Sequence, residues 1–364
     1  MLRSVIAVTC ETLIFVALSV AVGCLATFSS PIVPTASAKY LAYGDSITRG
    51  YTLSQPLTQA YPVLVAISEH VNFANNALDG DEACDVTTRE IFPNRDSPTL
   101  AQERFFTVLI GTNDVDRSNA VAYEPTFTLC HRAIVSWLGL PVELKVLAGS
   151  SGVSTSGLVT MGSFDDWNAW TTAGQGSAIA FKIKTSREGA IYAWPIIDDN
   201  SGASYSYSLD GLEIGSSNVR VNPRLSTYNG STKSLGFIRI GSVSAGTHVV
   251  TFTQTSSGSS GVSILGIGSP AISATGPLPT VLVGTIPYQH HESGSGNCTP
   301  TDPICLAYVQ DIENNAAQFS VDGLAVKIFD TREFMHGTAA EMSDTLHPNA
   351  LGQQEIGASV EAAW

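Results

Sequence analysis

The chain has 364 residues, of which 44% are hydrophobic and only 14% charged, and this excludes a disordered chain, because disorder requires low hydrophobicity and high charge. Lys and Arg number 18 against 32 Asp and Glu, a net charge of −14. So acidic a chain would be repelled by phosphate backbones, and we expect no nucleic acid partner. The length allows two or three domains with a sizeable core. A chain of 364 residues with only six cysteines is too long to be a disulfide-dense miniprotein.

The first 38 residues have the features of a secretory signal peptide. Arg3 precedes an apolar run at 13–28, and the segment 36–38, Ala-Ser-Ala, supplies the small residues typical of a cleavage site. We therefore predict export, with cleavage after Ala38. Two alternatives remain open: an uncleaved membrane anchor, because the apolar run is slightly long, and a lipoprotein, because segment 22–24 weakly resembles an acylation site. The protein would contact a membrane only if this segment were retained.

Cleavage would remove Cys10 and Cys24 and leave four cysteines, an even number suited to an oxidising compartment. Four cysteines allow three connectivities. We favour one bridge that closes a short Pro-rich loop and one that ties two loops of the same domain, namely Cys298 with Cys305 and Cys84 with Cys130. Buried free thiols are the alternative.

Strands and helices alternate along most of the chain. Continuous apolar runs of strand length recur at 40–43, 71–74, 105–110, 280–285 and 324–329. Helical patterns lie between and after them, at 60–70, 125–138, 304–317 and 349–363. This alternation predicts an α/β domain with a doubly wound parallel sheet.

Residues 143–275 differ from the rest. They are rich in Ser, Gly and Thr, and apolar and polar residues alternate with period 2, as at 179–184 and at 204–209 before a turn at Asp210-Gly211. Further strands are predicted at 237–240, 247–253 and 262–267. Short strands without helical patterns between them predict an all-β sandwich, jelly-roll-like, that folds as an independent module. We therefore expect one α/β domain, residues 39–142 and 276–364, interrupted by a β domain at 143–275.

Serine, histidine and aspartate occur at the ends of predicted elements. The segment 44–48 (GDSIT) follows the first strand and places Ser46 in a tight turn at the carboxyl end of a strand, where open α/β sheets build sites. Asp344 precedes His347 by three residues near the other end of the chain. A serine nucleophile needs a base, and the base needs a third group that fixes its tautomer. Each fragment alone is unspecific.

Two further blocks follow predicted strands: 75–80 (NNALDG) and 111–114 (GTND). With 44–48 and 344–347 they make four ordered blocks, and this set resembles the SGNH, or GDSL, hydrolase family. The resemblance covers the α/β part and not the insert, and it implies a three-layer α/β/α sandwich around a parallel sheet. One departure is Ala77, where the family usually has glycine, and it puts the path of that loop in question.

The resemblance also implies roles for individual residues. Ser46 would be the nucleophile, His347 the base that takes its proton, and Asp344 the group that orients the histidine. The oxyanion hole would consist of the backbone N–H groups of Ser46 and Gly80 and the side-chain amide of Asn113. Such donors are worth about 3 to 4 kcal/mol each in acyl transfer. This chemistry needs no metal or organic cofactor.

We therefore expect a secreted serine esterase that removes acetyl or another short acyl group from a carbohydrate through an acyl-enzyme, with the β insert aiding substrate capture. A lipase, thioesterase or polyester hydrolase with the same site is the alternative enzyme. A carbohydrate-binding surface protein without activity is the alternative from another class.

Two polar clusters could hold metal ions. Four acidic residues surround Gly80 and could bind calcium: Asp79, Asp81, Glu82 and Asp85. Their spacing matches no EF-hand loop, so we favour a solvated acidic loop. The segment 290–292 (His-His-Glu) could ligate a metal, but adjacent histidines in a Gly/Ser-rich loop favour a solvated segment.

Six aromatic residues of the insert could either stack on sugar rings or fill a sandwich core. They are Trp167, Trp170, Trp194, Tyr205, Tyr207 and Tyr228. The core interpretation is at least as well supported by the sequence.

Overall fold

The computed structural model describes residues 37–221, 225–226, 229–258, 260–290 and 298–364. Most of the predicted signal segment, including Cys10 and Cys24, lies outside these residues. No helix among the described residues is long and apolar enough to cross a bilayer.

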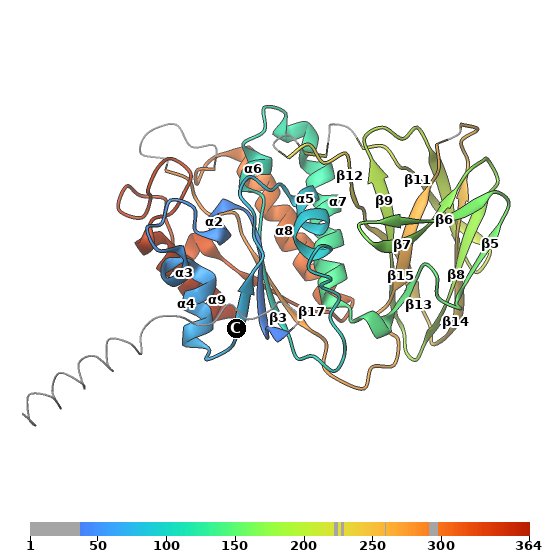
Figure 1. The fold of residues 1–364 in the computed structure, drawn as a ribbon, viewed down its shortest axis with the longest axis horizontal. Helices are drawn as coiled ribbons and strands as arrows, with labels where there is room; N and C mark the ends of the chain where they lie inside the picture. The colour runs from blue at the N-terminus through green and yellow to red at the C-terminus, as the bar shows by residue number, and fades with distance from the viewer. Residues whose placement is uncertain (1–36, 222–224, 227–228, 259, 291–297) are drawn as a thin grey trace, which may run out of the picture. The chain divides into compact units, whose positions relative to one another are not determined.

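A sheet of five parallel strands forms the centre of the α/β part (Figure 1). Its order is β17-β16-β3-β1-β2, and every neighbouring pair is parallel. The strands are β1 (Tyr40–Gly44), β2 (Phe73–Asn75), β3 (Phe105–Leu109), β16 (Thr280–Gly284) and β17 (Ala325–Phe329). All five lie in or beside the apolar runs that the sequence predicts as strands. Both faces of the sheet are covered, which explains why the runs are continuous and not alternating.

Helices cover both faces of this sheet. Successive side chains of a strand point to opposite faces, so Tyr40 and Ala42 pack with α4 (Tyr61–Ser68) and α9 (Ala350–Ala363). Leu41 and Tyr43 belong to a second core on the other face, with α5 (Ala83–Val86), α7 (Ala120–Gly139) and α8 (Pro303–Val321). The remaining short helices are α2 (Ser46–Arg49), α3 (Pro56–Gln59), α6 (Thr112–Val115), η2 (Thr87–Ile91), η3 (Val142–Leu144) and η5 (Thr331–Glu333).

The ends of the long helices follow from local sequence. Asp302 caps α8 by accepting hydrogen bonds from the backbone N–H groups of the first turn, and Pro303 occupies the first helical position, where its missing N–H is tolerated. Asn349 caps α9 in the same way. Helix α7 begins at Ala120, earlier than predicted, with Pro125 inside it.

The β part consists of two antiparallel sheets that face each other across a core of their own. One has the order β11-β10-β14-β8-β5, and the other the order β12-β9-β15-β7-β6, with β13 paired to β9 and β4 to β15. The strands of the first sheet are β5 (Val153–Ser156), β8 (Ala178–Thr185), β10 (Ser204–Leu209), β11 (Leu212–Asn218) and β14 (Gly246–Gln254). Those of the second are β4 (Lys145–Leu147), β6 (Val159–Phe164), β7 (Trp167–Thr172), β9 (Gly189–Asp198), β12 (Lys233–Leu235), β13 (Ile238–Val243) and β15 (Ser263–Gly268).

Several of these strands are not apparent from the sequence pattern. Strand β9 contains Pro195, which argues against a central strand because proline cannot donate to the ladder. Here Pro195 lies at a register irregularity, and its carbonyl still accepts from Gly236 N at 2.7 Å. The β6–β7 turn uses Asp165 and Asp166, both at positive φ, in place of the Asn-Gly or Asp-Gly pair that usually marks such a turn.

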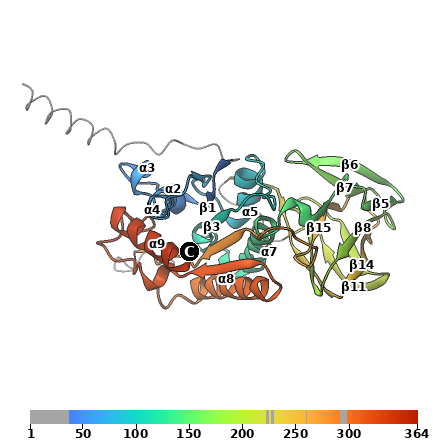
Figure 2. The same cartoon turned by 90° about the horizontal axis from the view of Figure 1, so that it is seen from below.

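The second β sheet also packs on α7, which lies between it and the parallel sheet (Figure 2). Trp194 of β9 is fully buried, its ring centroid is 5.3 Å from that of Trp137 in α7, and its Nε1 donates to Ser136 Oγ at 2.9 Å. Lys145 Nζ lies 4.0 Å from the centroid of the Trp137 ring and donates to the Trp137 carbonyl. The described residues thus form one compact unit, and residues 143–275 share a hydrophobic core with the α/β part.

Two disulfides link the cysteines in the pairing favoured from the sequence. Cys84 and Cys130 join α5 to α7, and Cys298 and Cys305 join the segment before α8 to its first turn. All four residues are buried.

Candidate active site

Strand β1 ends in a turn that only glycine can make. Gly44 has φ +151°, and a Cβ at this position would lie 2.1 Å from the Leu109 carbonyl oxygen of β3. The chain then enters α2, whose N-cap Asp45 accepts a hydrogen bond from Ile47 N at 2.9 Å. This turn places Ser46 at the carboxyl end of the central strands, with 6% of its surface exposed.

The loop before α9 brings a histidine and an aspartate to this serine. His347 Nε2 lies 3.0 Å from Ser46 Oγ, and His347 Nδ1 lies 2.9 Å from Asp344 Oδ2. Asp344 Oδ1 also accepts from the backbone N–H groups of Leu346 and His347, at 2.8 and 2.7 Å. The carboxylate is therefore fixed by the loop that carries it, and the three side chains form one continuous hydrogen-bonded chain.

The charge state of Asp344 follows from these contacts. Partial burial by itself would raise its pKa, but the hydrogen bonds from the backbone and side chain of His347 outweigh this and hold the pKa below its ordinary value. Asp344 is thus an anion at neutral pH, next to the nitrogen of His347 that faces away from Ser46. Such an anion favours the tautomer that leaves Nε2 free to accept a proton.

Buried carboxylates lie behind the serine. Burial raises the pKa of Asp45 to about 7, although its hydrogen bond from Ile47 N acts in the opposite direction. Glu90 is fully buried, accepts from Gly44 N at 3.0 Å, and has its pKa raised well above the ordinary value, again by burial. These acids support the serine turn and do not contact His347.

Gly80 and Asn113 lie at the same cavity as Ser46 and His347. This cavity has a volume of about 240 Å³ and is lined by Ser46, Tyr51, Asp79, Gly80, Asn113, Asp116, Leu346 and His347. Gly80 has φ +74°, and Asn113, at the start of α6, donates from Nδ2 to the Asp81 carbonyl at 2.8 Å. Four of the five residues that the sequence predicts for catalysis thus line one cavity, and the fifth, Asp344, is hydrogen-bonded to His347.

The loop that carries Gly80 tolerates Ala77. This residue is buried and is not among the residues at positive φ. Its N–H bonds to Asn75 Oδ1 at 3.2 Å, and the next residue, Leu78, donates to the Gly44 carbonyl at 3.2 Å. The missing glycine therefore does not divert the loop from the serine turn.

Three further groups at the cavity were not predicted. The Tyr51 ring is 53% exposed and its centroid lies 4.9 Å from that of His347. Asp79 forms an ion pair with Arg49 at 2.6 Å, and Asp116 accepts from Gln289 Nε2 at 3.0 Å. A signal was present in the sequence, because Asp79 lies within the block 75–80 and Asp116 and Tyr51 lie within a few residues of the blocks 111–114 and 44–48.

The prediction of a solvated acidic loop around Gly80 is wrong for three of its four residues. Asp81, Glu82 and Asp85 are fully buried, and only Asp79 reaches solvent. Asp81 pairs with Arg89, and Glu82 with Arg117 at 2.8 Å. Among the described residues, no group of three or more potential ligand side chains is arranged to hold a metal ion. The half-buried Arg89 compensates Asp81, the buried Arg117 compensates Glu82, and Asp85 accepts hydrogen bonds from Ser226 and Asn229, because an unpaired buried charge is costly.

The histidine pair lies partly outside the described residues, which exclude His291 and Glu292. His290 is described, and its backbone N–H donates to the Thr345 carbonyl at 3.0 Å. His290 thus supports the loop that carries Asp344 and His347.

The described aromatic residues of the insert pack in two hydrophobic cores, one between the two β sheets and one shared with α7. Trp194 and Tyr205 are fully buried, and Trp170 and Tyr207 pack against the core between the two β sheets. Trp167 contacts the rings of Phe92 and Trp137. Tyr228 lies outside the described residues. The core interpretation therefore holds for the five that are described.

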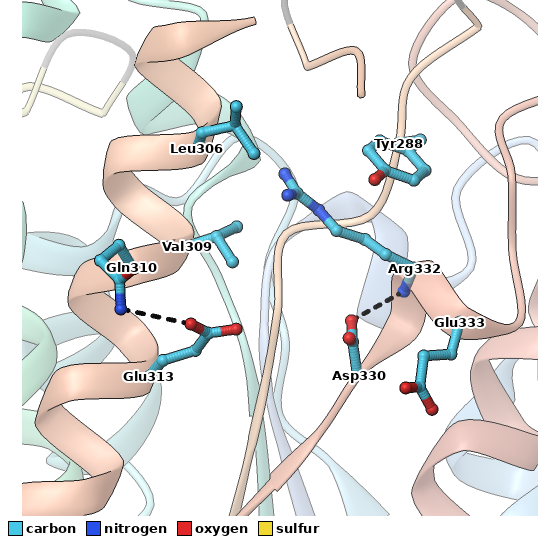
Figure 3. A pocket seen from close by; sticks show the side chains of 8 residues that line it. All are labelled: Tyr288, Leu306, Val309, Gln310, Glu313, Asp330, Arg332 and Glu333. Atoms are coloured by element: carbon cyan, nitrogen blue, oxygen red, sulfur yellow. Dashed lines mark hydrogen bonds between the residues drawn. The ribbon is translucent and has the colours of Figure 1, made fainter. Parts of the chain in front are cut away.

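A second cavity lies at α8 and the end of β17, away from Ser46 (Figure 3). It has a volume of about 390 Å³ and is lined by Tyr288, Leu306, Val309, Gln310, Glu313, Asp330, Arg332 and Glu333. Arg332 is held by the Ile286 carbonyl at 2.9 Å and lies 4.7 Å from the centroid of the Tyr288 ring. The lining contains no serine, cysteine or histidine, so it offers no nucleophile with an adjacent base.

Comparisons with known proteins give only structural neighbours. No family model matches the chain, and no curated protein matches it. It is similar to a two-domain esterase active on acetylated mannans, with TM-score 0.37, 11% identity, and coverage of 65% of this chain and 91% of that one. It is also similar to a member of the lipolytic G-D-S-L family from Veillonella parvula (TM-score 0.40, 12% identity, covering 89% and 96%). An acetylxylan esterase from Geobacillus stearothermophilus is a third neighbour (TM-score 0.39, 11% identity, covering 90% and 93%). The solved structures similar to this chain thus include esterases and a protein of the G-D-S-L family.

Proposed function

We propose that the protein is a serine ester hydrolase of the SGNH type. The observation that carries this proposal is the hydrogen-bonded chain from Ser46 Oγ through His347 to Asp344, with distances of 3.0 and 2.9 Å. A serine hydroxyl is a weak nucleophile until a base takes its proton, and the base needs an oriented anion behind it. A protein that only binds carbohydrate has no use for this arrangement.

The reaction would proceed in two steps. Ser46 Oγ attacks the ester carbonyl while its proton passes to His347 Nε2, and His347 returns this proton to the leaving alcohol as the acyl-enzyme forms. Water then attacks the acyl carbonyl and gives a proton to His347 Nε2. His347 passes this proton to Ser46 Oγ as the bond between Oγ and the acyl group breaks, which releases the acid and restores the serine hydroxyl. Asp344 stabilises the imidazolium in both steps.

The oxyanion would be held by the N–H groups of Ser46 and Gly80 and by the Asn113 amide. The hydrogen bond from Asn113 Nδ2 to the Asp81 carbonyl fixes the plane of this amide. A primary amide carries two N–H groups, so one can hold the loop while the other faces the substrate. Donors fixed before the reaction need no reorganisation when charge develops.

The acyl group would be short, because a cavity of about 240 Å³ bounded by Asp79, Asp116 and His347 offers little room for a long apolar chain.

For the alcohol we propose a carbohydrate. A groove of about 530 Å³ adjoins the site at the Arg49–Asp79 ion pair, and its lining is mixed. The polar residues Arg49, Asn75, Asn76, Arg89 and Asn94 stand beside seven apolar ones, Pro56, Leu57, Ala60, Val63, Phe73, Ala77 and Leu78. Amide and guanidinium groups suit sugar hydroxyls, and the exposed Tyr51 ring offers a face for stacking.

We also propose that the protein is exported. Two buried disulfides fit an oxidising compartment, and the segment 1–38 has the composition of a signal peptide.

The test is a panel of p-nitrophenyl esters of increasing chain length, together with acetylated polysaccharides, assayed with the wild type and Ser46→Ala. We expect kcat/KM to be higher for acyl chains of about two to four carbons than for ten or more, release of acetate from the polysaccharide, and a loss of several orders of magnitude in Ser46→Ala. Wild-type activity in Ser46→Ala would refute the serine mechanism. Preference for long chains would instead favour the lipase or polyester hydrolase alternative.

A further inference from the structure

A segment of the β insert reaches the loop that carries Gly80. Asn229 Nδ2 lies 3.0 Å from the Gly80 carbonyl oxygen and 3.0 Å from Asp81 Oδ1, and it also lies 3.3 Å from Asp85 Oδ2. Ser226 Oγ donates to Asp85 Oδ2 at 3.0 Å and accepts from Asn229 N at 3.1 Å. The insert thus contacts the backbone of a residue that lines the Ser46 cavity.

This segment is anchored from the other side as well. Leu225 is fully buried in the core shared with α7, and its carbonyl accepts from Tyr123 OH at 2.6 Å. Its N–H donates to Asp199 Oδ1 at 3.0 Å. Leu225 is therefore held by the α/β part and by the insert, and the neighbouring Ser226 contacts Asn229 N through its hydroxyl.

The loop around Gly80 depends on such support. Gly80 is at φ +74°, a conformation that glycine reaches without strain but does not prefer over others. Asn113 holds the Asp81 carbonyl on one side of this loop, and Asn229 holds the Gly80 carbonyl on the other. Two successive carbonyls are thus fixed by two side chains, one from the α/β part and one from the insert.

Asn229 also suits the charges around it. Asp81 and Asp85 are fully buried carboxylates that both contact its amide nitrogen. The two N–H groups of the amide face three acceptors, the Gly80 carbonyl and the two carboxylates, so one N–H is shared between acceptors. The amide donates without adding a charge, whereas a carboxylate of the same shape would repel Asp81 and Asp85.

We propose that Asn229 is a positioning residue that sets the orientation of the Gly80 N–H toward the oxyanion, so that the insert takes part in the chemistry and not only in substrate capture. This inference rests on the proposed function. The sequence assigned the insert to substrate capture alone. A displaced Gly80 N–H would also slow the hydrolysis of a small soluble ester, which cannot reach a remote binding surface on the insert.

The experiment compares Asn229→Ala with Asn218→Ala on p-nitrophenyl acetate. Asn218 is an exposed asparagine of β11 in the same insert, so its replacement is the matched control. We expect Asn229→Ala to lower kcat by about 10- to 100-fold, since loss of one oxyanion donor costs about 100-fold or more, while KM changes little. Asn218→Ala should leave both constants unchanged.

A second measurement separates positioning from general stability. A trifluoromethyl ketone that forms a tetrahedral adduct with Ser46 should lose affinity in Asn229→Ala by the same factor as kcat/KM, because both depend on the oxyanion donors. A merely structural role would lower the melting temperature without this proportional change. If Asn229→Ala does not fold, Ser226→Ala, which removes the contact that holds Asn229 N, should give a smaller loss of kcat in the same direction.

The outcomes are distinct from those for the proposed function. If Ser46→Ala abolishes activity but a folded Asn229→Ala retains wild-type kcat, the positioning role is wrong and the esterase proposal stands. An effect on KM alone would also overturn the positioning role. If the wild type hydrolyses no ester, both proposals fail.

Discussion

Asp344 Oδ2 and His347 Nδ1 lie 2.9 Å apart on one short loop, and the same carboxylate binds the backbone N–H of His347 at 2.7 Å. The aspartate therefore fixes both the position of the histidine backbone and the orientation of its ring. The ring then meets Ser46, a residue 301 positions earlier in the chain. The loop thus supplies a prearranged acid–base pair, and the fold supplies the nucleophile.

Asp344→Asn should leave the loop nearly intact but remove the anion that favours the productive histidine tautomer. If the proposed function holds, we expect kcat to fall by about 10⁴-fold, the loss known for neutralising the aspartate of a Ser-His-Asp triad. His347→Ala should lose as much as Ser46→Ala, and the double variant should be hardly worse, because the three residues act as a unit. Steady-state kinetics on p-nitrophenyl acetate measures this. Losses that multiply in the double variant would contradict it.

Asn113→Ala should remove an oxyanion donor and the hydrogen bond to the Asp81 carbonyl. We expect kcat to fall by roughly 100-fold or more with little change in KM. Asn314→Ala, an exposed position on α8, is a suitable control because it lies on a different element from the site. An unchanged kcat in Asn113→Ala would remove this amide from the oxyanion hole.

Asp45 should make the protein less stable as pH rises through the mildly acidic range. Its pKa is raised by burial from 3.8 to about 7, so between these values the folded state binds a proton that the unfolded state has lost. The free energy of unfolding contributed by this group therefore falls as pH rises from about 4 to 7 and is constant above. Asp96, whose pKa burial also raises to about 7, acts in the same direction.

Asp45→Asn removes one of these titrating groups while its amide oxygen can still accept from Ile47 N. Its urea midpoint, relative to that of the wild type, should therefore increase from pH 4 to pH 7 and then stay constant. Each unit of pKa difference between the folded and unfolded states corresponds to about 1.4 kcal/mol in the free energy of unfolding. Asn314→Ala, at an exposed position of α8, changes no titrating group and should show no such trend. A pH-independent difference for Asp45→Asn would contradict the prediction.

Residues 143–275, expressed alone, should retain β-type circular dichroism but expose the face that packs on α7. Trp194, Leu235 and Phe237 belong to this shared core, and loss of their partners leaves a large apolar patch. We expect the fragment to bind a dye such as ANS and to self-associate, as measured by fluorescence and sedimentation. A monomeric fragment with a cooperative melt and no dye binding would instead support the independent module expected from its composition.

The sequence determined the elements that depend on local pattern. Apolar-rich segments predicted all five strands of the parallel sheet. The central strands β1, β3 and β16 are nearly continuous in apolar residues because both of their faces are buried, whereas the edge strands β2 and β17 carry the exposed Asn75 and Lys327. Three short blocks after those strands contain Ser46, Gly80 and Asn113, and parallel strands bring their carboxyl ends to one edge of the sheet. The block with Asp344 and His347 lies before the last helix, and the resemblance of the four ordered blocks to a hydrolase family implied the roles of all five residues. The two disulfide pairings were also foreseen, although the sequence left three connectivities open.

Tertiary structure decided the features that depend on which distant segments meet. The acidic residues beside Gly80 look solvated in sequence, yet Asp81 and Asp85 are buried because Arg89 and Asn229 compensate them. Asn229 lies 149 residues from Gly80, and no local pattern links the two. Likewise, Trp194 is buried against α7 because the outer face of an inserted sheet has to cover its apolar side chains, and the sequence does not specify which surface covers them.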